Sequence, residues 1–350
     1  MPPRVGRRGI IGGLAGLGLP VAATSTKAGT IDRTAAIDGW AQRVRNILAR
    51  GRLPIIDVEA TYNRQIDIDK MVQWMDAGDV AQVCFAPGDN LGSTASLELH
   101  RLHPQHFVPT TKDGSSPEWY NNRETFVRGL RKDLASNDYF LLGEFELRHY
   151  PSPNQTRAGR MDRDVAVPLT DPSVDAVLAA AAQSGLAVQI HYELEDALLP
   201  PLEALLARHP TARVVWCHMG QMRFAERNTI YGIPYLKSLI ARFPNLHFDL
   251  GLAGPPHKHP WSGQLDQRIY TATGNPPWGG YLKEDWRGFI EQHADRVLAA
   301  SDIGADRYTN FPNSIQRQRD LILSKLSPRA ARLVAFENAW RLLTGRTWAS

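Results

Sequence analysis

Residues 55–62 read IIDVEATY, a run that starts with apolar residues and passes into polar ones. Near-continuous apolar runs are typical of strands buried on both faces, as in a parallel sheet covered by helices. Two acids, Asp57 and Glu59, stand within the run, and Thr61 follows them. The stretch therefore predicts a buried strand that carries carboxylates to one end of a sheet.

Further β-rich runs follow along the chain, and longer helical patterns separate them. The eight candidate strands are residues 53–59, 80–85, 106–111, 139–147, 186–192, 212–218, 246–251 and 297–302. One helical pattern begins with Asp171 as N-cap and ends at Gly185, and Ser327 and Gly345 bound the last one in the same way. Eight strands with intervening helices predict an α/β fold, a (β/α)8 TIM barrel with a C-terminal helix, over residues 51–350.

The first 29 residues have the pattern of an export signal. A basic start with the pair Arg7 and Arg8 precedes an apolar, glycine-rich run and then small residues. The arginine pair indicates the twin-arginine route, and the run is too short for a good membrane span. We expect a cleaved signal at residues 1–29, a lead-in segment at 30–50, and a periplasmic or secreted protein without stable membrane insertion. An uncleaved anchor and a disordered tail are the alternatives.

Charge and cysteine content exclude some classes of partner and site. Removing the four cationic residues of the signal from the 40 Lys and Arg leaves 36, which equals the 36 Asp and Glu. The mature chain is therefore close to neutral and has no Lys/Arg-rich block, so we expect no nucleic-acid partner. Cys84 and Cys217 stand in apolar runs and form no C-x-x-C pair, which argues against a thiolate zinc site. We expect a small-molecule substrate, and self-association into a homo-oligomer is left open.

Acids and histidines stand at the ends of several predicted strands. Glu59, Glu144, His191, His218 and Asp302 each lie at such an end. Barrel enzymes place their catalytic groups at the carboxyl ends of strands. Mixed histidine and carboxylate ligands suit Zn²⁺, Mn²⁺ or Fe²⁺. Because carboxylates buried together repel one another and lose solvation, the sequence predicts a divalent metal ion among them, or an arginine such as Arg148 that balances their charge.

Six motifs, in order, resemble the amidohydrolase superfamily in its single-domain metal-dependent hydrolase branch. They are IIDVE, GEFEL, VQIHYE, VVWCHMG, VLAASD and FENAWRLL, and they cover roughly residues 53–345. The most specific are CHMG, ASD and ENAWRLL. The resemblance implies hydrolysis of an amide, ester or lactone bond with one divalent metal, zinc first, with manganese and iron as alternatives.

The resemblance also assigns roles to individual residues. His191 matches the strand-five metal ligand, and His218 matches the strand-six histidine that binds a second metal or a substrate oxygen. Asp302 matches the strand-eight aspartate that touches the metal and takes the proton from water. Glu144 occupies strand four, where some branches have a bridging Lys or Glu. On strand one, Glu59 and Thr61 replace the usual His-x-His pair.

The first interpretation is one metal held by Glu59, His191 and Asp302, with Glu144 as a further ligand. Asp302 and His218 are then the catalytic residues. Groups predicted to bind the substrate are Arg148, Glu193, Trp261 and Trp278, the last two from the irregular segment 252–283.

Two alternatives stay open at this point. The Glu-x-Thr start and the HMGQ run favour a non-oxidative decarboxylase of an aromatic acid, because similar patterns occur in that branch of the superfamily. The loss of His-x-His favours a metal-free binding barrel.

Overall fold

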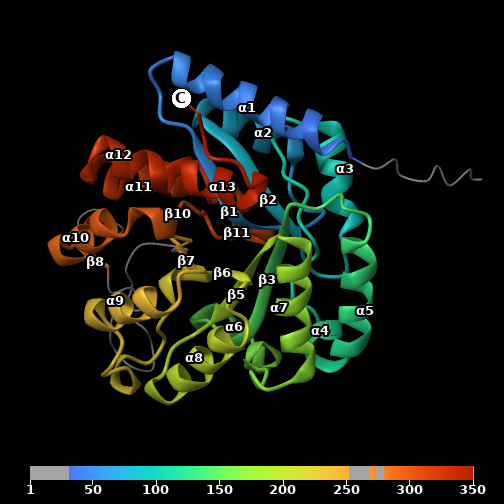
Figure 1. Ribbon diagram of the computed structural model, residues 1–350, viewed down its shortest axis with the longest axis vertical. Helices are drawn as coiled ribbons and strands as arrows, with labels where there is room; N and C mark the ends of the chain where they lie inside the picture. Colours follow the sequence, from blue (N-terminus) through green and yellow to red (C-terminus); the bar gives the residue numbers. More distant parts are fainter. Residues whose placement is uncertain (1–30, 252–268, 273–279, 350) are drawn as a thin grey trace, which may run out of the picture. The chain divides into compact units, whose positions relative to one another are not determined.

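The structure is a computed structural model that describes residues 31–251, 269–272 and 280–349. The predicted signal at 1–29 lies outside these residues. The described residues belong to the unit Ile31–Ser350. In this unit, helices surround the central strands (Figure 1).

Parallel strands form two sheets. One has three strands in the order β11-β1-β2, and the other has six in the order β10-β7-β6-β5-β3-β4. Within them, β4 alone runs antiparallel to its neighbour, and β8 and β9 form a separate antiparallel pair. The bounds are β1 Ile55–Tyr62, β2 Val80–Pro87, β3 Leu141–His149, β4 Val165–Ala166, β5 Ala187–Tyr192, β6 Arg213–Trp216, β7 Leu246–Asp249, β8 Tyr270–Ala272, β9 Gly280–Leu282, β10 Val297–Leu298 and β11 Ile303–Gly304.

Six predicted strands correspond to β1, β2, β3, β5, β6 and β7, and two differ from the prediction. The run 106–111 forms only isolated parallel bridges, at Phe107 and Thr110. Pro109 between them has no N–H for a ladder. The run 297–302 leads to two short strands, β10 and β11, because Asp302 between them is left-handed with φ 49°. The described strands therefore form parallel sheets, and the closed eight-stranded barrel stays a prediction.

The helices begin and end at the signals that the sequence carries. Asp171 accepts a hydrogen bond from the backbone N–H of Ser173 at 2.8 Å, and Gly185 ends α7 with φ 66°. Ser327 caps the last helical region, in which a π-helical turn, Leu333–Glu337, separates α12 from α13. The bounds are α1 Arg33–Ala49, α2 Ile68–Ala77, α3 Thr94–Leu102, α4 Pro117–Asn121, α5 Arg123–Leu134, α6 Pro153–Arg157, α7 Pro172–Ser184, α8 Leu199–Arg208, α9 Ile233–Arg242, α10 Glu284–Gln292, α11 Phe311–Leu321, α12 Pro328–Arg332 and α13 Asn338–Thr344.

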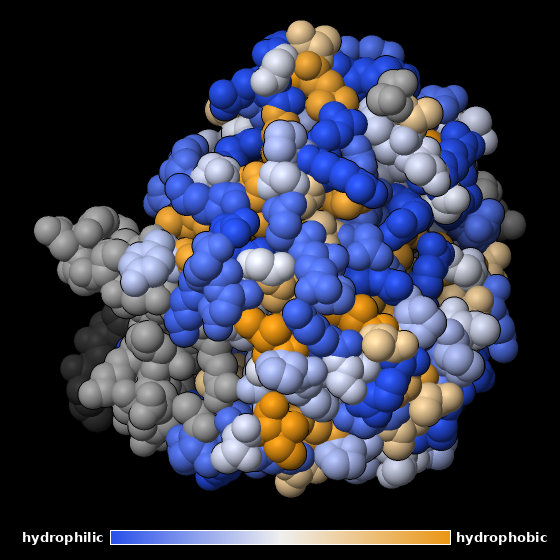
Figure 2. Space-filling view, turned by 60° about the vertical axis from the view of Figure 1, so that its left-hand side comes forward, coloured by the Kyte–Doolittle hydropathy of each residue, from blue (hydrophilic) through white to orange (hydrophobic). Residues whose placement is uncertain are grey.

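The interior between strands and helices is largely apolar, and both cysteines are buried free thiols. On the face shown in Figure 2, hydrophobic residues are scattered among hydrophilic ones. No helix in the described part of the chain is long and apolar enough to cross a membrane.

Candidate metal centre

Side chains from three neighbouring strands of the larger sheet, β3, β5 and β6, meet at one place. Glu144 lies on β3, His191 on β5, and His218 two residues after β6. The Oε1 atom of Glu144 is 2.9 Å from Nδ1 of His191 and 3.0 Å from Nε2 of His218. The two nitrogens are 3.0 Å apart. Three atoms that commonly bind metals therefore form a compact triangle below the surface.

Other hydrogen bonds decide which nitrogen of each histidine faces this triangle. Nε2 of His191 is 3.1 Å from Oε1 of Glu193, and Nδ1 of His218 is 2.7 Å from the carbonyl oxygen of Gly251. Because a carboxylate and a carbonyl accept hydrogen bonds, the protons sit on those outer nitrogens. In their neutral forms, both imidazoles therefore present a lone pair toward Glu144, as metal-binding histidines do.

Glu193 is itself held in place by an arginine. Its side chain is fully buried, and Nε of Arg223 lies 3.2 Å from both of its carboxylate oxygens. Burial alone would raise the pKa of Glu193, but Arg223 and His191 lower it to about 2. The sequence interpretation has Glu193 as a substrate-binding residue, whereas the structure places it behind His191, where it fixes the imidazole.

The turn after β6 brings His218 into the centre at a conformational cost. His218 and Met219 are left-handed, with φ of 59° and 52°. Such a conformation costs an L-residue about 1–2 kcal/mol. Asp249, at the end of β7, accepts the backbone N–H of His218 at 2.8 Å and so holds the turn. Gly220 completes it with φ 65°, and a Cβ there would lie 2.7 Å from the ring of Trp216. These contacts explain the CHMG motif.

The sequence interpretation did not single out Asp249. The available signal was the acid near the end of the strand-like run LHFDLG, which resembles the acids at the other strand ends. Its Oδ1 atom is occupied by backbone N–H groups, including that of His218, so it acts on the site by positioning.

The centre carries a surplus of buried negative charge. Burial, together with Asp302 and Glu144, raises the pKa of Glu59 well above its usual value. The Oε2 atom of Glu59 is buried, has no hydrogen-bond partner among the described residues, and lies 3.7 Å from Nδ1 of His218. Burial would lower the pKa values of the two histidines, but the surrounding acids raise them to about 10 for His218 and about 9 for His191. A cation would stabilise this arrangement.

Among the described residues, three groups of buried or half-buried side chains offer ligand atoms within 4.8 Å of one another: Glu144, His191 and His218; His149, His191 and Glu193; and Glu59, His218 and Asp249. The second and third groups use histidine nitrogens that already donate to oxygen acceptors. The first uses the two free lone pairs and a carboxylate, which is a donor set that zinc prefers. The residues at this position therefore fit a divalent metal ion.

The amidohydrolase family model matches residues 57–344 of the sequence. The chain belongs to the amidohydrolase family. It is therefore an enzyme of the amidohydrolase superfamily, as the resemblance of its motifs predicts. A comparison with curated proteins finds no significant match.

Solved structures of low sequence identity share the fold of this amidohydrolase. A crystal structure of an amidohydrolase II has 12% identity and a TM-score of 0.51, with 83% of this chain and 99% of that chain covered. A dihydroorotase from Campylobacter jejuni has 11% identity and a TM-score of 0.50, with 85% of each chain covered. A mutant organophosphorus hydrolase has 11% identity and a TM-score of 0.50, with 83% and 92% covered.

Asp302 lies beside the centre but outside its ligand groups. Its carboxylate is 3.1 Å from Nη2 of Arg307, and its backbone N–H donates to the carbonyl oxygen of Glu59 at 3.1 Å. Its charge also contributes to the raised pKa of His218. The structure thus groups Glu144, His191 and His218, and it does not group Asp302 or Glu59 with His191 as the sequence interpretation expects.

The remaining predicted residues have other surroundings. The guanidinium of Arg148 is 2.6 Å from Asp164 and stacks on the ring of Tyr150, so its contacts lie away from the centre. Trp261 and Trp278 lie outside the described residues. Substrate binding by these three side chains stays a prediction.

Loss of the Glu193 carboxylate is expected to weaken metal binding while the three ligands remain. We expect Glu193→Gln to lower metal affinity by about 10- to 100-fold, the usual cost of losing a partner that orients a ligand. Titration of the metal-free protein against a competing chelator measures this. Glu203→Gln on α8, a half-buried glutamate that pairs with Arg242, is the control, and equal affinities in both variants would contradict the positioning role of Glu193.

Proposed function

We propose that this amidohydrolase is a metal-dependent hydrolase that cleaves an amide, ester or lactone bond of a small molecule. The observation that carries the proposal is the convergence of Glu144, His191 and His218 within 2.9–3.0 Å. A divalent ion held there, zinc first, would supply Lewis-acid activation of water and of the substrate carbonyl. Three protein ligands are typical of catalytic zinc sites, which keep a position open.

The chain's own groups would then guide the proton and the substrate. Asp302 would accept a proton from the attacking water on its carboxylate and pass it to the leaving group. The predicted catalytic role of His218 would be limited to holding the ion, because Nδ1 of His218 already donates to Gly251 and Nε2 faces Glu144. Glu59 stays in the proposal as a further ligand, supported by its buried Oε2 atom, which lacks a partner among the described residues.

Two further predictions, closure of the barrel and export of the protein, also belong to the proposal. Closure of the barrel is supported by hydrogen bonds from both sheets to the end of β10, from the backbone N–H of Val58 in β1 to Ala299 just after β10 at 3.2 Å and from that of Leu250 to Leu298 in β10 at 3.0 Å. Export to the periplasm or the medium is supported only by the sequence pattern of residues 1–29.

Metal analysis and a substrate panel test the proposal. The purified protein is expected to contain stoichiometric divalent metal and to hydrolyse at least one ester, amide or lactone, with activity lost to a chelator and restored by zinc or manganese. Release of CO₂ from hydroxybenzoates, with no hydrolysis across the panel, would instead favour the decarboxylase. Full hydrolytic activity without metal would overturn the proposal.

Metal affinity is expected to rise with pH. In the metal-free protein the pKa of His191 is raised to about 9 and that of His218 to about 10, so both imidazoles are protonated at pH 6–8. A metal must displace these protons, and the apparent affinity should therefore increase by up to about tenfold per pH unit for each imidazole. Calorimetric titration in two buffers of different ionisation enthalpy measures the released protons, and a pH-independent affinity would contradict this result.

A further inference from the structure

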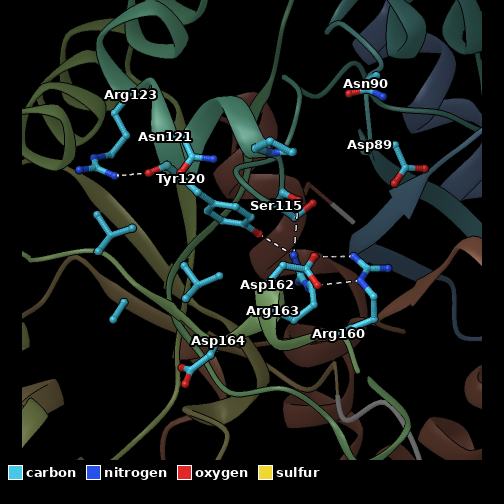
Figure 3. A pocket seen from close by; sticks show the side chains of 14 residues that line it. Asp89, Asn90, Ser115, Tyr120, Asn121, Arg123, Arg160, Asp162, Arg163 and Asp164 are labelled. Carbon is cyan, nitrogen blue, oxygen red and sulfur yellow. Dashed lines mark hydrogen bonds and ion pairs between the residues drawn. The ribbon is translucent and has the colours of Figure 1, made fainter. Parts of the chain in front are cut away.

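A pocket with a volume of about 580 Å³ lies against the edge strand β4. Its walls come from the loop after β2, from α4 and the start of α5, and from residues 160–167 (Figure 3). None of its lining residues belongs to the candidate metal centre. Its volume is in the range of ligand pockets, about 300–1,000 Å³.

A buried polar network forms one side of the pocket. The hydroxyl of Tyr120 donates to Glu146, and Arg163 both pairs with Glu146 and donates to the Tyr120 hydroxyl at 2.6 Å. The side chains of Glu146 and Arg163 are 6% and 14% exposed. Because this charge pair is satisfied within the protein, the wall is preorganised and electrically neutral.

Four further charged side chains of the lining also form ion pairs. Arg123 binds Asp171 at 2.8 Å, Asp164 binds Arg148, and Arg160 binds the neighbouring Asp162 at the exposed rim. Asp89 is the one charged lining residue that forms no ion pair with a described residue. An anionic ligand would have to break one of the other pairs, whereas the hydroxyl groups of a neutral ligand could donate to Asp89 without breaking any.

Three lining side chains keep their hydrogen-bonding groups free. Asp89, Asn90 and Asn121 are exposed and form no side-chain hydrogen bond with any described residue. In Figure 3, Asp89 and Asn90 lie on one side and Asn121 on the other, with the ring of Tyr120 between them. An amide offers both donors and acceptors, and a carboxylate accepts two hydroxyl groups.

The lining also has an apolar part. Val165 and Ala166 of the edge strand, Val167 after it and Pro117 are its apolar members. A ligand that suits the pocket therefore combines an apolar C–H face with several hydroxyl groups and no negative charge. We propose that this pocket binds a neutral polyhydroxylated molecule, a sugar of one or two rings. The site needs no metal and goes beyond the proposed hydrolytic function.

Saturation-transfer NMR on the full, chelator-treated chain tests the proposal without turnover. The probes are glucose, galactose, xylose and cellobiose, with gluconate and glucosamine as hydroxylated anion and cation. We expect saturation transfer from the protein to at least one neutral sugar. The affinity for that sugar should be at least tenfold weaker in the double variant Asp89→Ala/Asn121→Ala. The matched control is Asp38→Ala/Asn46→Ala on α1, which should bind as the unmodified protein does.

The contradicting results are equally definite. No saturation of any neutral sugar would overturn the proposal, as would equal sugar affinity in the pocket and control variants. Tighter binding of gluconate or glucosamine than of every neutral sugar would show that the pocket selects charge. Circular dichroism checks that each variant is folded. We expect folding to be unaffected, because the replaced side chains are exposed. A failed hydrolase test would leave these outcomes unchanged.

Discussion

His218→Ala is expected to abolish stoichiometric binding of a divalent metal. The substitution removes one of three converging ligand atoms, Nε2, which lies 3.0 Å from both Glu144 and His191. Loss of a partner that only orients a ligand costs about 10- to 100-fold in affinity, so loss of the ligand itself should cost more than about 100-fold. Competitive titration with a chromogenic chelator measures the change, and hydrolysis of any substrate found in the panel should fall with it.

The matched control is His247→Ala. His247 is a histidine of β7 that is as buried as His218, with 6% exposure against 5%, and it belongs to none of the ligand groups in the described residues. It should lower stability and leave the metal stoichiometry near one. If His218→Ala also retained full metal content, the assignment of the ligands would be wrong.

Asp302→Asn is expected to lower kcat by about 10²- to 10⁴-fold, the usual contribution of a general base. Metal content should be unchanged, because the carboxylate lies outside the ligand groups and pairs with Arg307. Stability should change little, since this ion pair involves a half-exposed arginine and exposed pairs contribute about 0–1 kcal/mol. Steady-state kinetics at saturating metal, together with metal analysis, separate the two effects.

Asp320→Asn, on the exposed side of α11, serves as the control and should leave kcat unchanged. Loss of metal in Asp302→Asn would show that Asp302 is a ligand, as the sequence interpretation expects. Unchanged kcat and unchanged metal content together would remove Asp302 from the mechanism.

The parallel strands could be predicted because their signal is local. Six apolar runs become strands, since strands that are buried on both faces consist mainly of apolar residues. The two differences also have local causes that hydrophobic patterns do not report. Pro109 removes a ladder donor in the run 106–111, and the left-handed Asp302 divides the last strand into β10 and β11.

The candidate site was only partly predictable. Glu144, His191 and His218 are visible in the sequence because each is a polar residue in a strand-like apolar run. Which nitrogen of each histidine faces inward depends on Glu193 and on the carbonyl of Gly251, and the sequence does not specify those contacts. The polar pocket beside β4 escaped prediction for the same reason, because its walls come from separate loops and helices.

Anomalous X-ray diffraction at the zinc edge, on crystals of the zinc-loaded protein, tests the central claim most directly. We predict one strong peak bound by Oε1 of Glu144, Nδ1 of His191 and Nε2 of His218, at about 2.0–2.2 Å from each. No peak in this region would contradict the account. So would a peak bound by Glu59 and Asp302, with His218 still hydrogen-bonded to Glu144 and not bound to the metal.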